Sequence, residues 1–366
     1  MLFIFILLLA LFVIFNLRRI MPGYRGLFFS AFLVIVTIGS FLLSRTYYFV
    51  SIVQSALVIW ISQILWLFLI FDLVLLISRV IRRQRQSSNF VMRSVRVLFV
   101  VSVLLTLVFV GYGIQHNRHY KVRSAEIALL SVDSSSGQDN FSVLFFSDLH
   151  LDMLFAKEKL ERLINSADSL KPDFIVFGGD FADVSDSLLV EQGYMSLLQQ
   201  LSSKARDDAI AVGGNHEAYM QRRGSDLPTF LENSGFRVLE DSTLCFDKAC
   251  FTGRKDFQLA RMTDEPRKNL AEILPHSNLP WILVDHQPKG IEAEHQGRLP
   301  DFAMSGHTHG GQFFPVTVLI RFIWSVSEGI GRLDGVRWLV SSGFDCWGPP
   351  VRVLSDSEIW LIKFVK

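Results

Sequence analysis

Residues 141–150 read Phe-Ser-Val-Leu-Phe-Phe-Ser-Asp-Leu-His and join a strand to two polar side chains that suit a metal ion. The run Phe141–Phe146 is short and apolar, which predicts a buried β-strand. Asp148 and His150 follow it directly. Because side chains alternate along an extended chain, we expect both to project to the same side. A carboxylate and an imidazole at this spacing can bind one cation together.

Four further apolar runs end in the same way. The runs and the polar residues after them are 174–177 with Asp180, 209–212 with Asn215 and His216, 281–284 with His286, and 302–304 with His307 and His309. Ligands of α/β proteins gather outside the carboxyl ends of strands, so these clusters should converge. A single cluster of this kind is more often a turn, but five in series predict a site. Oxygen and imidazole ligands without thiolate suit a hydrolytic pair of Mn, Fe or Zn ions.

The clusters resemble those of the calcineurin-like metallophosphoesterases, and in particular the membrane-tethered bacterial phosphodiesterase branch. The segment that carries the resemblance furthest is Gly306-His307-Thr308-His309-Gly310-Gly311-Gln312. The resemblance covers residues 141–366 and includes the ending Glu358–Leu361. It implies an α/β fold, namely a four-layer sandwich of two mixed β-sheets flanked by helices.

The same resemblance implies a dinuclear metal site and a general acid. Asp148, His150 and His309 would hold the first metal, Asn215, His286 and His307 the second, and Asp180 would bridge them. Two metals about 3.5–4 Å apart can share a hydroxide that attacks phosphorus in line. His216 would protonate the leaving group, which suits an imidazole that titrates near neutral pH. Asp183 would orient His216, and it could also cap a helix.

One position departs from a related group of enzymes. In the protein Ser/Thr phosphatases an Arg follows the position equivalent to Asp183, whereas this chain has Val184. The loss of a bidentate phosphate clamp argues against a phosphoprotein substrate and favours a phosphodiester or a lipid-linked phosphate. Arg254 and Lys255 could supply charge instead, or form a solvated face. The apolar segment 313–324 is either a lip that admits a lipid substrate or packing against the core or a membrane.

The first third of the chain has a different composition. The whole chain is 50% hydrophobic with mean hydropathy +0.34 and net charge +1, which favours lipid over nucleic acid as a partner. We expect a transmembrane region at residues 1–117, a linker at 118–140 and the catalytic domain at 141–366. Four runs are long enough to span a bilayer. They are Leu2–Leu17, Leu27–Leu43, Ala56–Ile77 and Val97–Ile114, and the first lacks the flanking signals of a cleaved leader.

Arginine sets the orientation of these spans. Arg is frequent within 18–25 and 79–96, whereas only Arg45 lies between the second and third spans. The positive-inside rule makes the two Arg-rich connectors cytoplasmic. The chain is then an integral protein of a bacterial inner membrane with its catalytic domain outside the cytoplasm. We interpret Asp72, inside the third span, as an interface charge satisfied by water or Arg rather than as a functional residue.

Two points stay open at the level of sequence. Cys245 and Cys250 could face each other across a hairpin and form a disulfide in an oxidising compartment, but we favour two unpaired thiols. The alternative activity is a cytoplasm-facing pyrophosphatase of a nucleotide-linked acyl sugar in the lipid A pathway, which the Arg distribution opposes. A non-catalytic membrane sensor is the other alternative, which the full set of candidate ligands opposes.

Overall fold

A computed structural model describes residues 15, 19, 21, 24–43, 47–82, 86–129, 140–152, 155–292, 295 and 297–365. These residues form two compact units. The first contains the described residues up to Gln115 together with Gly348–Val351, and the second contains His116–Trp347 and the described residues from Arg352 onward.

The first unit is helical. Its described helices are α2 (Tyr24–Leu43), α3 (Tyr48–Arg82) and α4 (Ser88–Asn117), the last of which ends in the second unit. By length and composition, the stretches Phe49–Ile81 and Ser88–Asn117 could each cross a membrane. Within α2 the apolar helical stretch is Ala31–Ser40, which is shorter than these two candidate spans. The described residues therefore contain two candidate spans, not four, and the predicted span Leu2–Leu17 lies outside them apart from Phe15.

Two polar side chains of α3 form hydrogen bonds within this unit. Trp60 donates its indole N–H to Ser102 Oγ of α4 at 3.0 Å. Asp72 accepts two hydrogen bonds from Arg19 Nη1, at 2.9 Å and 3.0 Å. The interpretation of Asp72 as a charge satisfied by Arg is therefore confirmed, although its partner is far away in the sequence.

The second unit is built on two six-stranded sheets, both of them mixed. In spatial order the first contains β1 (Tyr120–Ala128), β12 (Ser357–Val365), β2 (Phe141–Phe146), β3 (Phe174–Phe177), β4 (Asp208–Ala211) and β5 (Arg237–Val238). The second contains β10 (Gly329–Leu333), β11 (Val336–Val340), β9 (Phe302–Ser305), β8 (Trp281–Val284), β7 (Cys250–Gly253) and β6 (Ser242–Cys245). All five predicted strands are present, three in the first sheet and two in the second.

Alternation along the strands explains why the two sheets pack face to face. Val143 and Phe145 of β2 belong to the same buried cluster as Ile282 of β8 and Met304 of β9. Their neighbours in sequence point the other way, so Leu144 packs with the helices instead. Strands that are buried on both faces have continuous apolar sequences, which is why these strands could be predicted from the sequence.

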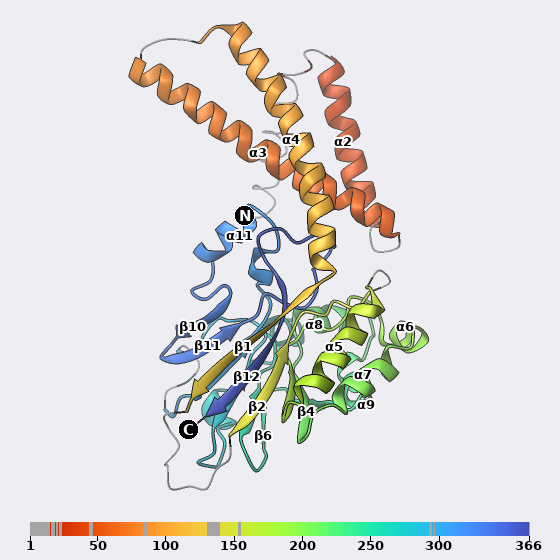
Figure 1. Cartoon of the computed structure of the whole chain (residues 1–366), viewed down its shortest axis with the longest axis vertical. Coiled ribbons are helices and arrows are strands. Elements are labelled where there is room, and N and C mark those ends of the chain that lie inside the picture. The colour runs from red at the N-terminus through yellow and green to blue at the C-terminus, as the bar shows by residue number, and fades with distance from the viewer. Residues whose placement is uncertain are drawn as a thin grey trace. The chain divides into compact units, whose positions relative to one another are not determined.

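Helices cover the outer face of the first sheet. The helices of this unit are α5 (Lys157–Leu170), α6 (Asp186–Glu191), α7 (Tyr194–Ser202), α8 (Asn215–Gln221), α9 (Leu227–Asn233), α10 (Phe257–Thr263) and α11 (Val316–Leu319), with the 3₁₀ helices η1 (Leu270–Glu272), η2 (His309–Gly311) and η3 (Ile320–Phe322). Figure 1 shows α5, α6, α7 and α9 grouped beside β2 and β4. The outer face of the second sheet is covered mainly by η1 and connecting segments, for example Leu270 against Trp281.

Part of the predicted linker is a strand. Residues 120–128 form β1, which pairs in parallel with β12 from Tyr120↔Ser357 to Ala128↔Val365. The second unit starts even earlier, because Asn117 donates to Asp345 Oδ1 at 2.8 Å. Strand β1 mixes polar with apolar residues and is largely exposed, and its pairing partner is β12, near residue 366. Neither property gives an apolar run, so the sequence suggested a linker.

The cysteine prediction is wrong. Cys245 and Cys250 face each other across the β6–β7 hairpin and form a disulfide. The third cysteine, Cys346, is buried and unpaired. The preference for two thiols followed residue statistics, whereas the register of the hairpin places the two residues directly opposite each other.

If residues 120–128 are a strand, its buried face must contribute to stability. Ile127 is 4% exposed, whereas Val122 on the same strand is 50% exposed. We expect Ile127→Ala to lower the free energy of unfolding by about 2–4 kcal/mol and Val122→Ala by less than about 0.5 kcal/mol. Denaturant unfolding in detergent measures both. Equal, small effects would show that this stretch is a linker after all.

Candidate metal centre

The loops after β2 and β3 carry the first acidic candidates. Asp148 and His150 lie beyond the end of β2, and both have left-handed backbone conformations, with φ of 57° and 46°. The two loops pair with each other, because Asp148 donates its N–H to Gly179 O at 2.9 Å and His150 donates to Asp180 O at 3.1 Å. We expected Asp148 and His150 to converge because side chains alternate along an extended strand, and that reason is wrong. The side chains converge because the backbone turns at each of them.

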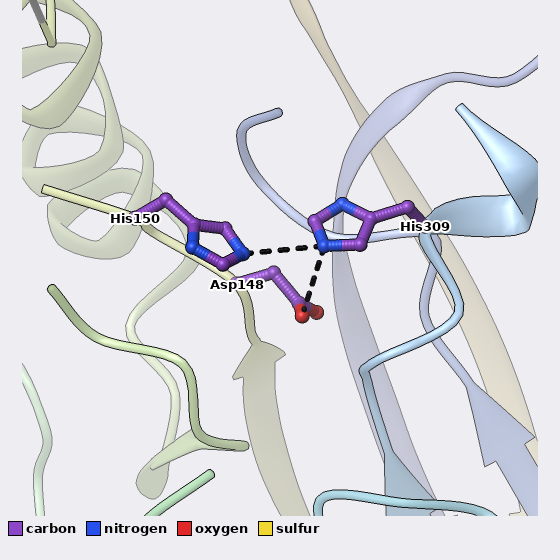
Figure 2. A group of neighbouring side chains, drawn as sticks. All are labelled: Asp148, His150 and His309. Atoms are coloured by element: carbon purple, nitrogen blue, oxygen red, sulfur yellow. Dashed lines mark hydrogen bonds and ion pairs between the residues drawn. The ribbon is translucent and has the colours of Figure 1, made fainter. Parts of the chain in front are cut away.

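Asp148, His150 and His309 form a compact group (Figure 2). His309 Nε2 lies 3.2 Å from His150 Nε2 and 3.5 Å from Asp148 Oδ1. All three residues are buried. The resemblance assigned these three residues to one metal, and their ligand atoms lie close enough together to hold one.

Asp180, His286 and His307 form a second group. His286 Nε2 lies 3.1 Å from Asp180 Oδ2. Its other ring nitrogen, Nδ1, is 2.8 Å from Gly178 O. A carbonyl only accepts, so Nδ1 carries the hydrogen and Nε2 is the atom that faces Asp180, as in metal-binding histidines held by a backbone carbonyl. Asp180 Oδ2 is also 3.8 Å from His150 Nε2, so this carboxylate lies between the two groups.

Asn215 supplies a further test of whether the site fits a cation. It begins α8, next to His216, whose N–H donates to Asp180 Oδ1 at 2.9 Å. The Oδ1 atom of Asn215 is buried and has no hydrogen-bond partner among the described residues. A buried amide oxygen without a partner is costly, and binding a cation would remove that cost. The donor set of carboxylate, amide and imidazole therefore fits divalent metals.

His216 is held from one side by Asp183. The Nδ1 atom of His216 is hydrogen-bonded to Asp183 Oδ1, and its Nε2 lies 4.0 Å from Asp180 Oδ2. Asp183 Oδ1 is also 3.5 Å from His150 Nδ1. The alternative role of Asp183 as a helix cap is wrong, because Ser185 caps α6 by accepting from the N–H of Leu188.

Glu217 is a residue of the site to which the sequence alone assigned no role. Its buried carboxylate accepts backbone N–H groups from the two loops on either side. The donors are Asp180 at 2.9 Å, Phe181 at 2.6 Å, Ala182 at 3.4 Å and Gly214 at 2.5 Å. Glu217 therefore fixes the loop of Asp180 to the loop of Asn215. The only local signal was its position three residues after the helix cap Gly214, as in a capping box.

Charges in the site shift the pKa values of its imidazoles in opposite directions. Burial lowers the pKa of His150, but the carboxylates of Asp183 and Asp180 outweigh it and raise the value to about 9. Burial and the neighbouring His286 lower the pKa of His307 to about 3. Neutral and protonated imidazoles therefore coexist around the carboxylates, which is the pattern expected where protons stand in for metal ions.

The pKa values of the carboxyl groups are also shifted in opposite directions. Burial raises the pKa of Asp148. Burial also acts to raise the pKa of Asp180, but His286 and His216 reverse that effect and hold it well below its usual range. For His216, burial lowers the pKa and Asp180 with Asp183 raises it, for a net increase. His216 therefore tends to keep a proton that a general acid needs.

Buried arginines hold the loops rather than the site. Arg352 donates to the carbonyls of His309 at 3.3 Å and Asp345 at 2.7 Å. Arg254 is 1% exposed and donates to Asp241 Oδ1 at 3.0 Å. Lys255 lies 2.9 Å from Glu265 Oε2. The buried Arg254 is therefore not part of a solvated face, whereas a contribution of either residue to phosphate binding stays a prediction.

The apolar segment 313–324 contains α11 and η3. Phe322 and Ile323 are 83% and 71% exposed, so packing against the protein core is wrong for them. Trp324 turns inward, and its ring centroid lies 5.5 Å from that of His307 in an edge-on arrangement. The segment therefore borders the site and also presents apolar side chains to the outside.

Comparisons with known proteins agree with this geometry. The profile of the calcineurin-like phosphoesterase family matches residues 141–311. An uncharacterized metallophosphoesterase of Aquifex aeolicus is 30% identical over 226 residues, which cover 59% of this chain and 82% of that protein. The chain belongs to the calcineurin-like phosphoesterases. The fold of two mixed sheets with helices is thus a calcineurin-like fold.

Two other relatives cover larger shares of this chain. An uncharacterized metallophosphoesterase of Helicobacter pylori strain J99 is 27% identical over 248 residues, which cover 67% of this chain and 64% of that protein. The chain thus spans just under two thirds of that relative's length. A transmembrane protein with metallophosphoesterase domain of Danio rerio is 27% identical over 323 residues, which cover 83% of this chain and 71% of that protein.

Glu217 offers a direct test of how the loops are held. Glu217→Gln puts an amide N–H₂ group against backbone N–H donors and leaves at least one of them without an acceptor. We expect the free energy of unfolding to fall by about 1–3 kcal/mol and Mn²⁺ affinity to fall at least tenfold. Thermal unfolding and metal titration measure the two effects. Glu232→Gln, at an exposed position of α9, is the matched control, and an equal response of both variants would contradict the assigned role.

Proposed function

We propose that this chain is a membrane-anchored, metal-dependent phosphoesterase that hydrolyses a phosphodiester or a lipid-linked phosphoester. The observation that carries the proposal is the position of Asp180 between two groups of candidate ligands. The proposed ligands are Asp148, His150 and His309 for one metal, Asn215, His286 and His307 for the other, and Asp180 for both. We propose Mn, Fe or Zn as the ions. When bound, they would activate water and stabilise charge on the phosphoryl oxygens.

The residues of the chain would orient the substrate and move the proton. Asp183 holds His216 Nδ1, so His216 Nε2 is left facing the site, where it would donate its proton to the leaving oxygen. Glu217 and Gly178 would fix the loop of Asp180 and the ring of His286 before the substrate arrives. Because these groups are already in place, little reorganisation is needed during the reaction.

The environment of Val184 supports a substrate other than a phosphoprotein. Val184 is half-buried and packs against the core beside the helices, so no bidentate cation replaces it at this position. The exposed Phe322 and Ile323 beside the site favour an apolar substrate portion or contact with a bilayer. A phospholipid or another lipid-linked phosphate meets both conditions. Nucleic acid is not an expected partner.

The helices and the disulfide support the proposed location. The two apolar helices α3 and α4 are suited to anchoring the chain in a membrane, which we propose is a bacterial inner membrane. A disulfide such as Cys245–Cys250 persists in oxidising compartments and is rare in the cytosol. It therefore favours an extracytoplasmic catalytic domain with up to four spans, and it weighs against the cytoplasm-facing pyrophosphatase.

Hydrolysis of bis-p-nitrophenyl phosphate tests the activity. We expect turnover by the full chain in detergent with added Mn²⁺. His216→Ala should lower kcat by about 10²–10⁴-fold while Mn²⁺ still binds, because the general acid is lost and the ligands are kept. Asp180→Asn should lower both activity and metal binding. His276→Ala, at an exposed histidine, is the control. An inert wild-type chain loaded with metal would end the enzymatic proposal.

Metal binding should release protons. His150 has its pKa raised to about 9, so it is protonated at pH 7.5 and must become neutral to bind a metal. We expect the apparent affinity for Mn²⁺ to rise as pH increases from about 6.5 to 9 and to level off above that. Calorimetry at pH 7.5 in two buffers of different ionisation enthalpy should give a release of about one proton or more for each chain. Identical heats in the two buffers would contradict the release of a proton from His150 on metal binding.

A further inference from the structure

Two exposed aromatic side chains flank His216. The ring centroid of Tyr219 lies 5.7 Å from that of His216, and the centroid of Trp347 lies 6.3 Å from it. Tyr219 and Trp347 are 44% and 55% exposed, whereas the His216 side chain is only 12% exposed. The imidazole of His216 is therefore bordered by two larger rings that are open to solvent.

Trp347 is held in this position by Gln312. The side-chain Oε1 of Gln312 accepts the N–H of Trp347 at 3.0 Å, and its Nε2 donates to Trp347 O at 3.2 Å. Gln312 is 6% exposed, and its own carbonyl accepts from Val353 N–H at 2.9 Å and Ser355 Oγ at 3.1 Å. Gln312 is the last residue of the segment that carries His307 and His309. Both ends of its side-chain amide hydrogen-bond the backbone of Trp347.

The direction of His216 defines what the two rings would contact. Asp183 holds Nδ1, so the proton for the leaving group must come from Nε2, which faces Asp180. An oxygen that takes this proton lies beside His216, and the group bonded to that oxygen must leave the site past the neighbouring surface. Tyr219 and Trp347 are exposed rings of that neighbouring surface.

We propose that Tyr219 and Trp347 form a leaving-group subsite that accepts a planar or apolar group bonded to the leaving oxygen. Gln312 is a positioning residue that acts through Trp347. The role of the subsite rests on the proposed function, because it takes His216 as the general acid. The geometry of the rings and of Gln312 stands independently of that role.

Binding of phosphonates tests the subsite without turnover. Phenylphosphonate and methylphosphonate differ only in the group on phosphorus, and neither has an ester bond to hydrolyse. With the Mn²⁺-loaded full chain, calorimetry should show tighter binding of phenylphosphonate. Trp347→Ala should reduce that preference by roughly 3–10-fold, and Trp347→Phe should keep most of it. Val190→Ala, at an exposed apolar residue of α6, is the matched control.

A double-mutant cycle tests the role of Gln312. Gln312→Ala should reduce the preference for phenylphosphonate about as much as Trp347→Ala does. In the Trp347→Ala background it should change the preference less than twofold, because the two residues act as a unit. If Gln312→Ala weakens both phosphonates equally, or if its effect adds to that of Trp347→Ala, the positioning role is wrong.

The two proposals fail in different ways. A wild-type chain that hydrolyses bis-p-nitrophenyl phosphate but binds both phosphonates equally overturns the subsite and leaves the phosphoesterase. A chain that hydrolyses nothing but prefers phenylphosphonate, with the preference lost in Trp347→Ala, supports a ring-binding subsite and overturns the proposed function.

Discussion

The burial of Asp148 and Asp180 in one place is the constraint on which the second unit depends. Both carboxylates are almost fully buried, and the carboxylate of Glu217 is a third buried one, next to Asp180. Buried charges of one sign need positive charge nearby, whether from imidazolium groups or from divalent cations. The histidines that meet this need come from both sheets, with His150 after β2 and His286 after β8. The sheets must therefore pack so that the carboxyl ends of their strands share one edge.

The cations near this edge show how the charge is divided. Arg352 donates to loop carbonyls and Arg254 donates to the Asp241 carboxylate, so both guanidinium groups have partners within the protein. This division agrees with Val184 at the position where the protein phosphatases have a guanidinium.

The sequence predicted the features that depend on local pattern. The five strands were legible because they are buried on both faces, and the polar residues after them fell at strand ends where α/β proteins bind ligands. It did not predict β1, whose polar residues gain their place only by pairing with the end of the chain. The disulfide of Cys245 and Cys250 was considered but not favoured, and the role of Glu217 was missed. Both depend on which backbone lies opposite, and a single stretch of sequence does not contain that information.

Backbone conformation divides the candidate site residues into two sets, those with positive φ and those without. Asp148, His150, Asp180, His307 and His309 all have positive φ. Among residues other than glycine, that conformation is enriched in Asn, Asp and His, so the turn alone favours residues that can bind metals at these positions. A related chain without catalytic activity could keep these residues because its loops have the same backbone conformation. Asn215, His216 and His286 lie outside the positive-φ set, so their loss would be the earliest mark of a decayed enzyme.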